Sequence, residues 1–166
     1  MSFYDRHGKI ALSKTDGMTY HTTEGIVLAK IPHGEADALF TIYTRDFGKI
    51  RALAQGVQKE SAKLRGHLEP LSLSRITFVQ GRGGERLTHA LLLERWFPPD
   101  MEYERVALAW QITDTVDRTC FPYQADPALW NLLRSHLEHL RTASSLAAQK
   151  FLTNFHTELL KCTGVA

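Results

Sequence analysis

The sequence of 166 residues contains only two cysteines and no long apolar run. Cys120 and Cys162 form no Cys-x-x-Cys pair, which argues against a disulfide scaffold and a zinc site and fits a reducing compartment. No segment approaches the roughly 20 consecutive apolar residues that a membrane-spanning helix needs. Residues 1–16 lack the apolar core of a secretory signal. We therefore expect a cytoplasmic protein without a membrane partner.

Charge is nearly balanced over the chain, with a net value of +2, but the basic residues are unevenly placed. Between Arg45 and Arg86 there are nine basic residues against four acidic ones. A local positive excess on a nearly neutral protein is typical of a surface that binds a polyanion. From composition alone, a solvated strand surface explains the same excess equally well.

Apolar and polar residues alternate between Thr19 and Trp96, which is the pattern of β-strands. Residues 40–43 and 49–54, on either side of the turn at 45–48, predict a β-hairpin with one buried face. Five short strands fold economically into a closed or nearly closed barrel, because closure removes exposed edges. The other three expected strands are Glu24 to Ile31, Leu71 to Gln80 and Arg86 to Glu94.

The longest connection in this part of the chain, Gln55 to Pro70, lies between the third and fourth expected strands. A five-stranded barrel with a long, often partly helical segment at that point is the plan of an OB-fold. Such folds commonly bind oligonucleotides across their second and third strands. We therefore predict a β barrel, a five-stranded OB-fold, over residues 19–97, followed by a small all-α domain over residues 98–166.

The change to helical spacing occurs at residues 97–100, Phe-Pro-Pro-Asp, where two prolines end the last strand. Asp100 is expected to cap the first of three helices, and Asp126, followed by Pro127, to cap the second. The third is expected to begin near Ser145 and to end near Gly164. The apolar residues expected to face inward are Tyr103, Val106, Ala107 and Trp110, then Leu129, Leu133, Leu137 and Leu140, then Leu152, Phe155 and Leu159.

The basic residues of the predicted barrel form a candidate phosphate-binding groove. Lys49 and Arg51 are two residues apart on one strand, so both face solvent if Ile50 and Ala52 face the core. On the partner strand Tyr43 could offer a ring for base stacking, and an aromatic packed at the barrel rim is the alternative. The other candidate contacts are Arg45, Lys59, Lys63, Arg65 and Arg82.

Motifs for catalysis and for cofactor binding are missing. The turn at residues 81–84, Gly-Arg-Gly-Gly, lacks the Lys-Ser/Thr of a P-loop and joins two strands, so we expect a flexible hairpin tip. His136 and His139 lie one turn apart, but their order around Glu138 matches no zinc motif. We expect no catalytic residue, no metal and no cofactor. A metal-dependent nuclease or hydrolase would need a ligand set that the sequence does not show.

Four segments carry a family resemblance: Glu24-Gly25-Ile26-Val27-Leu28, Gly34-Glu35-Ala36-Asp37, Thr44-Arg45-Asp46-Phe47-Gly48-Lys49 and Leu64-Arg65-Gly66-His67-Leu68-Glu69-Pro70. In order and spacing they resemble the N-terminal domain of the bacterial RecO recombination-mediator family (DNA repair protein O), and the last resembles its LRG-LEP stretch. The resemblance covers residues 20–98. Beyond Pro99 it rests on the helical pattern.

The resemblance implies a non-enzymatic DNA repair and recombination mediator. Such proteins bind single- and double-stranded DNA and promote annealing of complementary strands. With RecR they help to load the RecA recombinase onto strands coated by single-strand binding protein, whose C-terminal tail docks on the helical domain. By this resemblance Lys49, Arg51, Lys63 and Arg65 contact DNA, and the protein acts at the nucleoid. The alternative is a protein-interaction adaptor that uses the barrel and the helices without binding DNA.

The chain departs from the family pattern at both ends. Family members start near a segment like the one at Met18, so residues 1–18 are expected to be a disordered N-terminal extension. Members usually continue past a segment like residues 158–164 into further helices and, in many, a four-cysteine zinc module, whereas this sequence stops at Ala166. The resemblance therefore implies a shortened helical domain, and no zinc ligand is assigned to Cys162.

Overall fold

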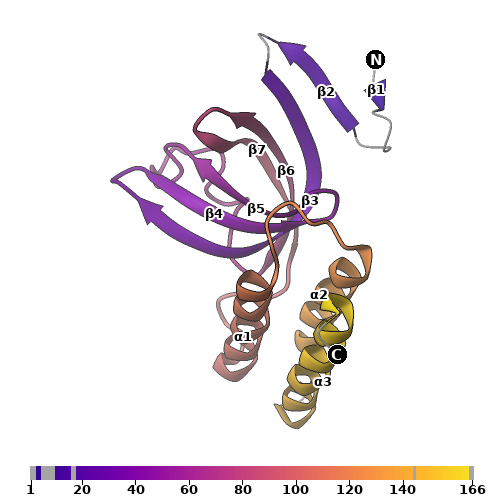
Figure 1. The fold of residues 1–166 in the computed structure, drawn as a ribbon. Coiled ribbons are helices and arrows are strands. Elements are labelled where there is room, and N and C mark those ends of the chain that lie inside the picture. The colour runs from indigo at the N-terminus through magenta and orange to yellow at the C-terminus, as the bar shows by residue number, and fades with distance from the viewer. Residues whose placement is uncertain (1–2, 5–9, 16–17, 144, 165–166) are drawn as a thin grey trace.

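The alternating pattern between Thr19 and Trp96 forms the strands of one sheet, and the helical spacing after it forms three helices (Figure 1). The structure is a computed structural model that describes residues 3–4, 10–15, 18–143 and 145–164. The strands are β1 (Phe3–Tyr4), β2 (Ile10–Thr15), β3 (Met18–His33), β4 (Asp37–Thr44), β5 (Gly48–Ala54), β6 (Ser72–Gly81) and β7 (Gly84–Arg95). The helices are α1 (Tyr103–Thr119), α2 (Pro127–Leu140) and α3 (Ser145–Thr163).

Strands β3 to β7 close into a ring. The strand order is β3-β4-β5-β7-β6, and β6 pairs back onto β3. Neighbours are antiparallel except β5 and β7, which pair in parallel at Ala52 with Glu85 and at Leu53 with Arg86. A closed five-stranded sheet followed by helices is consistent with an OB-fold plus a helical domain. The predicted fold class is therefore confirmed.

The N-terminal residues extend the sheet beyond the ring. Residues 3–4 and 10–15 form β1 and β2, and β2 pairs with the first part of β3, as at Ala11 with His21. This differs from the disorder expected for residues 1–18, because the start of β3 pairs with β6 along one edge and offers its other edge to a further strand. Met18 itself begins β3, and the remaining residues of that expected extension lie outside the described ranges.

Two hydrophobic cores share the ring. Inward side chains such as Phe40, Ile50 and Phe78 fill its interior. A second core lies on its outer face, where fully buried Trp96 belongs to the same cluster as Leu133 and apolar residues of all three helices. Figure 1 shows α1 beneath the ring with α2 and α3 beside it. Because this second core is continuous, the helices are fixed against the sheet.

Glu94, near the end of β7, adds a polar tie between the ring and α2. Its Oε2 accepts a hydrogen bond from the indole Nε1 of Trp96 at 3.0 Å, and its Oε1 pairs with Nη2 of Arg134 at 2.9 Å. Both carboxylate oxygens are thus used, and the indole N–H of a buried tryptophan is satisfied.

The first helix differs from the sequence expectation at its start and in its buried face. It begins at Tyr103 with Glu102 as N-cap, so the expected Asp100 cap is wrong; residues 98–101 first form a turn, in which the Met101 N–H donates to the Pro98 carbonyl. Tyr103 is 84% exposed and Trp110 is 41% exposed, so the expected inward face is also wrong at these two positions. The residues that the ring and the other helices bury are Ala109, Ile112, Thr113 and Val116.

The second and third helices follow the expectation. The Asp126 side chain accepts hydrogen bonds from the N–H groups of Ala128 and Leu129, and Pro127 occupies the first helical position. All four predicted leucines of α2 are buried, as are Phe155 and Leu159 of α3. Along the described part of the chain, no helix is long and apolar enough to span a membrane.

Gly48 gives a first prediction, since its φ is +68° and an added Cβ would lie 2.2 Å from the backbone oxygen of Gln124. We expect Gly48→Ala to lower the free energy of unfolding by about 1 to 3 kcal/mol more than Gly34→Ala, because Gly34 has a similar φ of +66° but open space around it. Chemical denaturation of both variants measures the difference. Equal losses would mean that only backbone strain matters at Gly48.

His136 gives a second prediction, for the pH dependence of stability. It lies between α2 and α3 against Phe151 and Phe155, and its Nε2 is buried without a hydrogen-bond partner in the described structure. Burial lowers the pKa of His136 below its ordinary value of 6.5; the hydrogen bond to the Leu132 carbonyl and nearby Glu158 oppose this shift, and His139 adds to it. The unfolded chain therefore takes up this proton more readily than the folded protein.

The free energy of unfolding should consequently fall as the pH is lowered from about 7.5 to about 5.5. His136→Phe keeps an aromatic ring without a titrating group and should flatten this dependence. His156→Gln, at an exposed position, is the control for the loss of a histidine. Urea denaturation across this pH range checks both variants. A pH dependence in His136→Phe equal to that of the parent would contradict the prediction.

Candidate nucleic-acid interface

The β4–β5 hairpin carries the residues that were predicted from the sequence to lie at the centre of the interface. Tyr43 pairs with Lys49 and Thr41 pairs with Arg51, so these side chains share one face of the hairpin. Tyr43 is fully buried and Lys49 is 9% exposed, whereas Arg51 is exposed. The expected solvent exposure of Tyr43 and Lys49 is therefore wrong. The strand alternation is as predicted, but the helical part covers this face at one end of the hairpin.

Tyr43 is a core residue in this fold. Its ring belongs to the cluster that joins the sheet to the helices, which excludes base stacking on it without opening the core. Its hydroxyl has no hydrogen-bond partner among the described residues, and burial raises the pKa of Tyr43 well above its ordinary value. The residue therefore stays a neutral phenol that packs, as in the rim alternative considered from the sequence.

Lys49 holds the end of α1 against β5. Its Nζ donates to the backbone oxygen of Asp117 and to Asp117 Oδ1, the latter at 3.2 Å. Its backbone oxygen accepts a hydrogen bond from the Tyr123 N–H at 3.0 Å, and Lys49 also forms an isolated β-bridge with Pro122. The positive charge is thus neutralised inside the protein and is not presented to a polyanion.

The basic loop, residues 55–70, presents Lys59, Lys63 and Arg65 to solvent. Within the described structure none of the three forms an ion pair. A succession of turns replaces the partly helical segment that the OB-fold plan suggested. The loop therefore offers three unpaired cations on one connection.

Both ends of the basic loop are tied to the ring. Near its start, the Gly56 N–H donates to Asp37 Oδ1 at 2.7 Å. Near its end, the His67 backbone oxygen accepts from Ser74 Oγ at 2.7 Å, and His67 Nδ1 accepts from the Leu92 N–H at 3.2 Å. The exposed cations therefore project from a connection whose ends are held.

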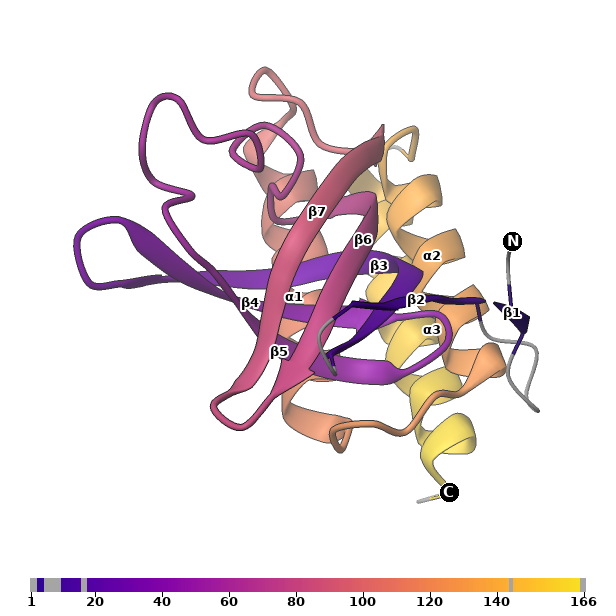
Figure 2. The ribbon, with the colours of Figure 1, turned by 90° about the horizontal axis from the view of Figure 1, so that it is seen from above.

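The remaining two predicted contacts lie at the other end of the ring. Arg82 is exposed in the turn between β6 and β7, whose neighbouring residues pair with the Tyr20 end of β3. Arg45 is exposed beside Glu24, whose carbonyl accepts its N–H. The basic loop starts instead beside Asp37, and Figure 2 shows it and the β6–β7 turn at separate ends of the sheet. The structure thus divides the predicted cations into two groups, with Arg51 between them.

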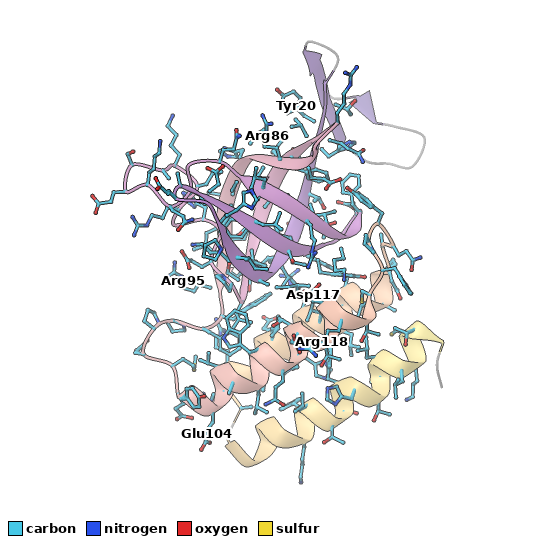
Figure 3. The ribbon with its side chains drawn as sticks, turned by 60° about the vertical axis from the view of Figure 1, so that its left-hand side comes forward. Tyr20, Arg86, Arg95, Glu104, Asp117 and Arg118 are labelled. Atoms are coloured by element: carbon cyan, nitrogen blue, oxygen red, sulfur yellow. The ribbon has the colours of Figure 1, made fainter. Side chains whose placement is uncertain are left out.

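The sequence analysis did not select several other exposed basic and aromatic residues as DNA contacts. Arg75 and Arg86 are exposed on β6 and β7, and their strand alternation was a signal that could have found them. Tyr123 and Arg118, by contrast, lie in the α1–α2 connection and at the end of α1, and their position beside β5 depends on tertiary packing. Figure 3 shows Arg86 on the sheet, and Asp117 and Arg118 on α1 below it.

The groups considered for metal or nucleophilic chemistry are engaged elsewhere. Burial raises the pKa of Cys120 to about 11, so its thiol is protonated at neutral pH. The Nδ1 atoms of His136 and His139 face the backbone oxygens of Leu132 and Ser135 within α2. In the residues that the structure describes, no group of three or more His, Cys, Asp or Glu side chains could hold a metal ion.

A closed five-stranded ring with exposed basic residues on its loops and strands, packed on three helices, defines a protein of the OB-fold class. Residues 18–96 match the family described as Recombination protein O N terminal. This match confirms the resemblance found in the sequence.

Relatives extend the likeness into the helices. Over 160 residues the chain is 34% identical to the DNA repair protein RecO of Synechococcus sp. (strain JA-2-3B'a(2-13)), covering 90% of the chain and 56% of that relative. It is 35% identical to the protein of the same name from Gloeobacter violaceus, covering 90% and 57%, and 32% identical to that of Moorella thermoacetica, covering 86% and 52%. The chain spans about half the length of these curated relatives.

Lys49 and Arg51 give a third prediction, because they share one face of the β4–β5 hairpin but Lys49 is buried and Arg51 is exposed. Lys49→Ala leaves the Asp117 carboxylate and its backbone oxygen without their donor, so the free energy of unfolding should fall by about 1 to 3 kcal/mol. Arg51→Ala removes an exposed side chain and should change it by less than about 0.5 kcal/mol. Thermal or urea denaturation of both variants distinguishes the roles. A stable Lys49→Ala protein would show that this ion pair is dispensable.

Proposed function

We propose that the protein is a non-enzymatic DNA repair and recombination mediator that binds single- and double-stranded DNA. The observation that carries the proposal is the basic loop, whose three exposed cations, Lys59, Lys63 and Arg65, have no ion-pair partner in the described structure and project from an OB-type ring. The match of residues 18–96 to the Recombination protein O family and the names of the relatives support the same role.

Phosphate binding accounts for affinity in this proposal. Exposed lysine and arginine side chains neutralise phosphates and release the counterions condensed on the nucleic acid. Helix residues 98–166 carry eight acidic against six basic residues, so the ring is the part of the chain that attracts a polyanion. DNA is therefore attracted first to the ring and its loops.

Annealing and partner binding are the finer parts of the proposal. The cations lie at two ends of the ring, and neutralising the phosphates of two complementary strands lowers their mutual repulsion. As the sequence resemblance implies, the protein would act with RecR to help load RecA onto strands coated by single-strand binding protein. The surface contributed by the helices is where the tail of the latter protein would dock.

A fourth prediction tests DNA binding by the basic loop. The triple variant Lys59→Ala, Lys63→Ala, Arg65→Ala should bind a labelled single-stranded oligonucleotide at least about tenfold more weakly at low salt than the parent. The slope of log K against log salt should become shallower by about 2, because each lost contact to a single strand removes about 0.7. Fluorescence anisotropy at several salt concentrations measures both quantities.

The matched control removes the same net charge from the helical part: Arg141→Ala, Lys150→Ala, Lys161→Ala, all at exposed positions. This control should bind within about twofold of the parent. Equal weakening in both variants would mean that only net charge matters, and not the loop. A folded parent protein that binds no DNA at low salt would overturn the proposed function and favour the adaptor alternative.

A further inference from the structure

A groove runs between β5 and the end of α1, beside the Lys49 contact. Its volume is about 550 Å³. One wall comes from β5 and the start of β7, and the other from the end of α1 and the connection to α2. We call it the β5–α1 groove. The residues that line it are Lys49, Ile50, Arg51, Glu85, Asp117, Arg118, Pro122 and Tyr123.

Tyr123 brings an aromatic ring to this groove. The residue is 47% exposed, in contrast to the buried Tyr43. Its φ is +60°, a left-handed conformation that is unusual for a bulky residue. The hydrogen bond from its N–H to the Lys49 carbonyl and the neighbouring β-bridge at Pro122 hold the backbone in this conformation. Strained backbone that the surroundings hold in place is found preferentially at functional positions.

Two arginines bring positive charge to the same groove. Arg51 is exposed, and no ion pair of the described residues involves it. The Arg118 side chain is 79% exposed, and its Nε lies 2.8 Å from Asp114 Oδ2 in an exposed pair of a kind that contributes little to stability. Because a guanidinium carries five N–H donors, Arg118 can bind a second acceptor alongside this pair.

The acidic residues of the groove do not cancel this charge. Of the two acids that line the groove, Asp117 is neutralised by Lys49, so Glu85 alone among the lining residues faces two arginines; Asp114, the partner of Arg118, does not line the groove. An exposed ring next to two guanidinium groups is the combination with which proteins bind single-stranded nucleic acid, since bases stack on aromatic faces and phosphates pair with cations. A duplex offers its phosphates but keeps its base faces stacked inside.

We propose that the β5–α1 groove binds a nucleotide of single-stranded DNA, with the base stacked on Tyr123 and the adjoining phosphates paired with Arg51 and Arg118. This inference rests on the proposed function and adds to it a base-stacking residue, the role for which Tyr43 was predicted. Arg51 lies between the two groups of cations on the ring, so a strand in the groove continues toward either group.

The fifth prediction separates stacking from phosphate binding by using two ligands. Wild-type protein should bind a labelled 12-nucleotide oligothymidylate more tightly than an abasic oligomer of the same length and charge. Tyr123→Asn removes the ring while asparagine tolerates the left-handed conformation. It should weaken binding of the oligothymidylate about tenfold and change binding of the abasic oligomer by less than about twofold, since only the oligothymidylate loses a stacked base.

Two control variants accompany Tyr123→Asn. Tyr123→Phe keeps the ring and should bind both ligands like the wild type. Tyr103→Asn removes an aromatic side chain that is 84% exposed and lies about 21 Å from Asp117 along α1, so it should also leave binding unchanged. Unchanged oligothymidylate binding by Tyr123→Asn, or equal weakening for both ligands or in Tyr103→Asn, would overturn the stacking role.

The same titrations separate failure of this inference from failure of the proposed function. Wild-type protein that binds both ligands equally binds phosphates without stacking, which overturns the groove inference and leaves DNA binding intact. Wild-type protein that binds neither ligand overturns the proposed function itself. Thermal denaturation of each variant shows whether it is folded.

A second measurement on the wild type does not depend on any variant. A 4-thiothymidine oligonucleotide irradiated in the complex should crosslink to the peptide that contains Tyr123. Crosslinks found only outside residues 118–123 and β5 would overturn the groove as a binding site.

Discussion

The arrangement of the molecule depends on the contact between the start of β5 and the connection from α1 to α2. Gly48 lets the Gln124 backbone approach so closely that no side chain fits between them. Next to it, Lys49 binds Asp117 through its side chain and Tyr123 through its carbonyl. An ion pair that is largely buried gains little net stability, because both charges lose water. Its geometric demands instead fix where α1 ends relative to the sheet, and thus which face of the β4–β5 hairpin stays open.

This contact gives residues of the same type different roles. Lys49 and Arg51 are both cationic and share a face, yet the helical part covers one and leaves the other free. The packing of the helical part on the ring also buries Tyr43, whereas Tyr123, in the connection from α1 to α2, is exposed beside β5. A basic and aromatic surface thus persists beside β5, but its aromatic ring comes from a connection some eighty residues later in the chain.

Much of the fold could be predicted because its signals are local. Strand alternation located the ring, and the Asp126-Pro127 pair located the start of α2, since a cap acts within its own turn. The exposed loop cations could be predicted for the same reason, because polar turns stay at the surface. Asp100 was misassigned because residues 98–101 form a turn before α1 begins at Tyr103. Trp110 was misassigned because the packing of α1 on the ring decides which of its faces is buried, and residues near Trp110 do not encode that packing. The β5–α1 groove could not be predicted, since its walls meet only in the folded chain.

A nearly neutral protein can distinguish single-stranded from duplex DNA when phosphate pairing and base stacking both contribute to its affinity. Phosphate pairing by the ring cations acts on any strand and weakens as salt rises. Stacking on an exposed ring depends on an unpaired base and changes little with salt, because no counterion is released. With few cations, the first contribution stays small enough for the second to decide between ligands. In the proposed function, a modest basic surface therefore favours single strands, whereas a strongly basic one would hold duplex and single strand alike.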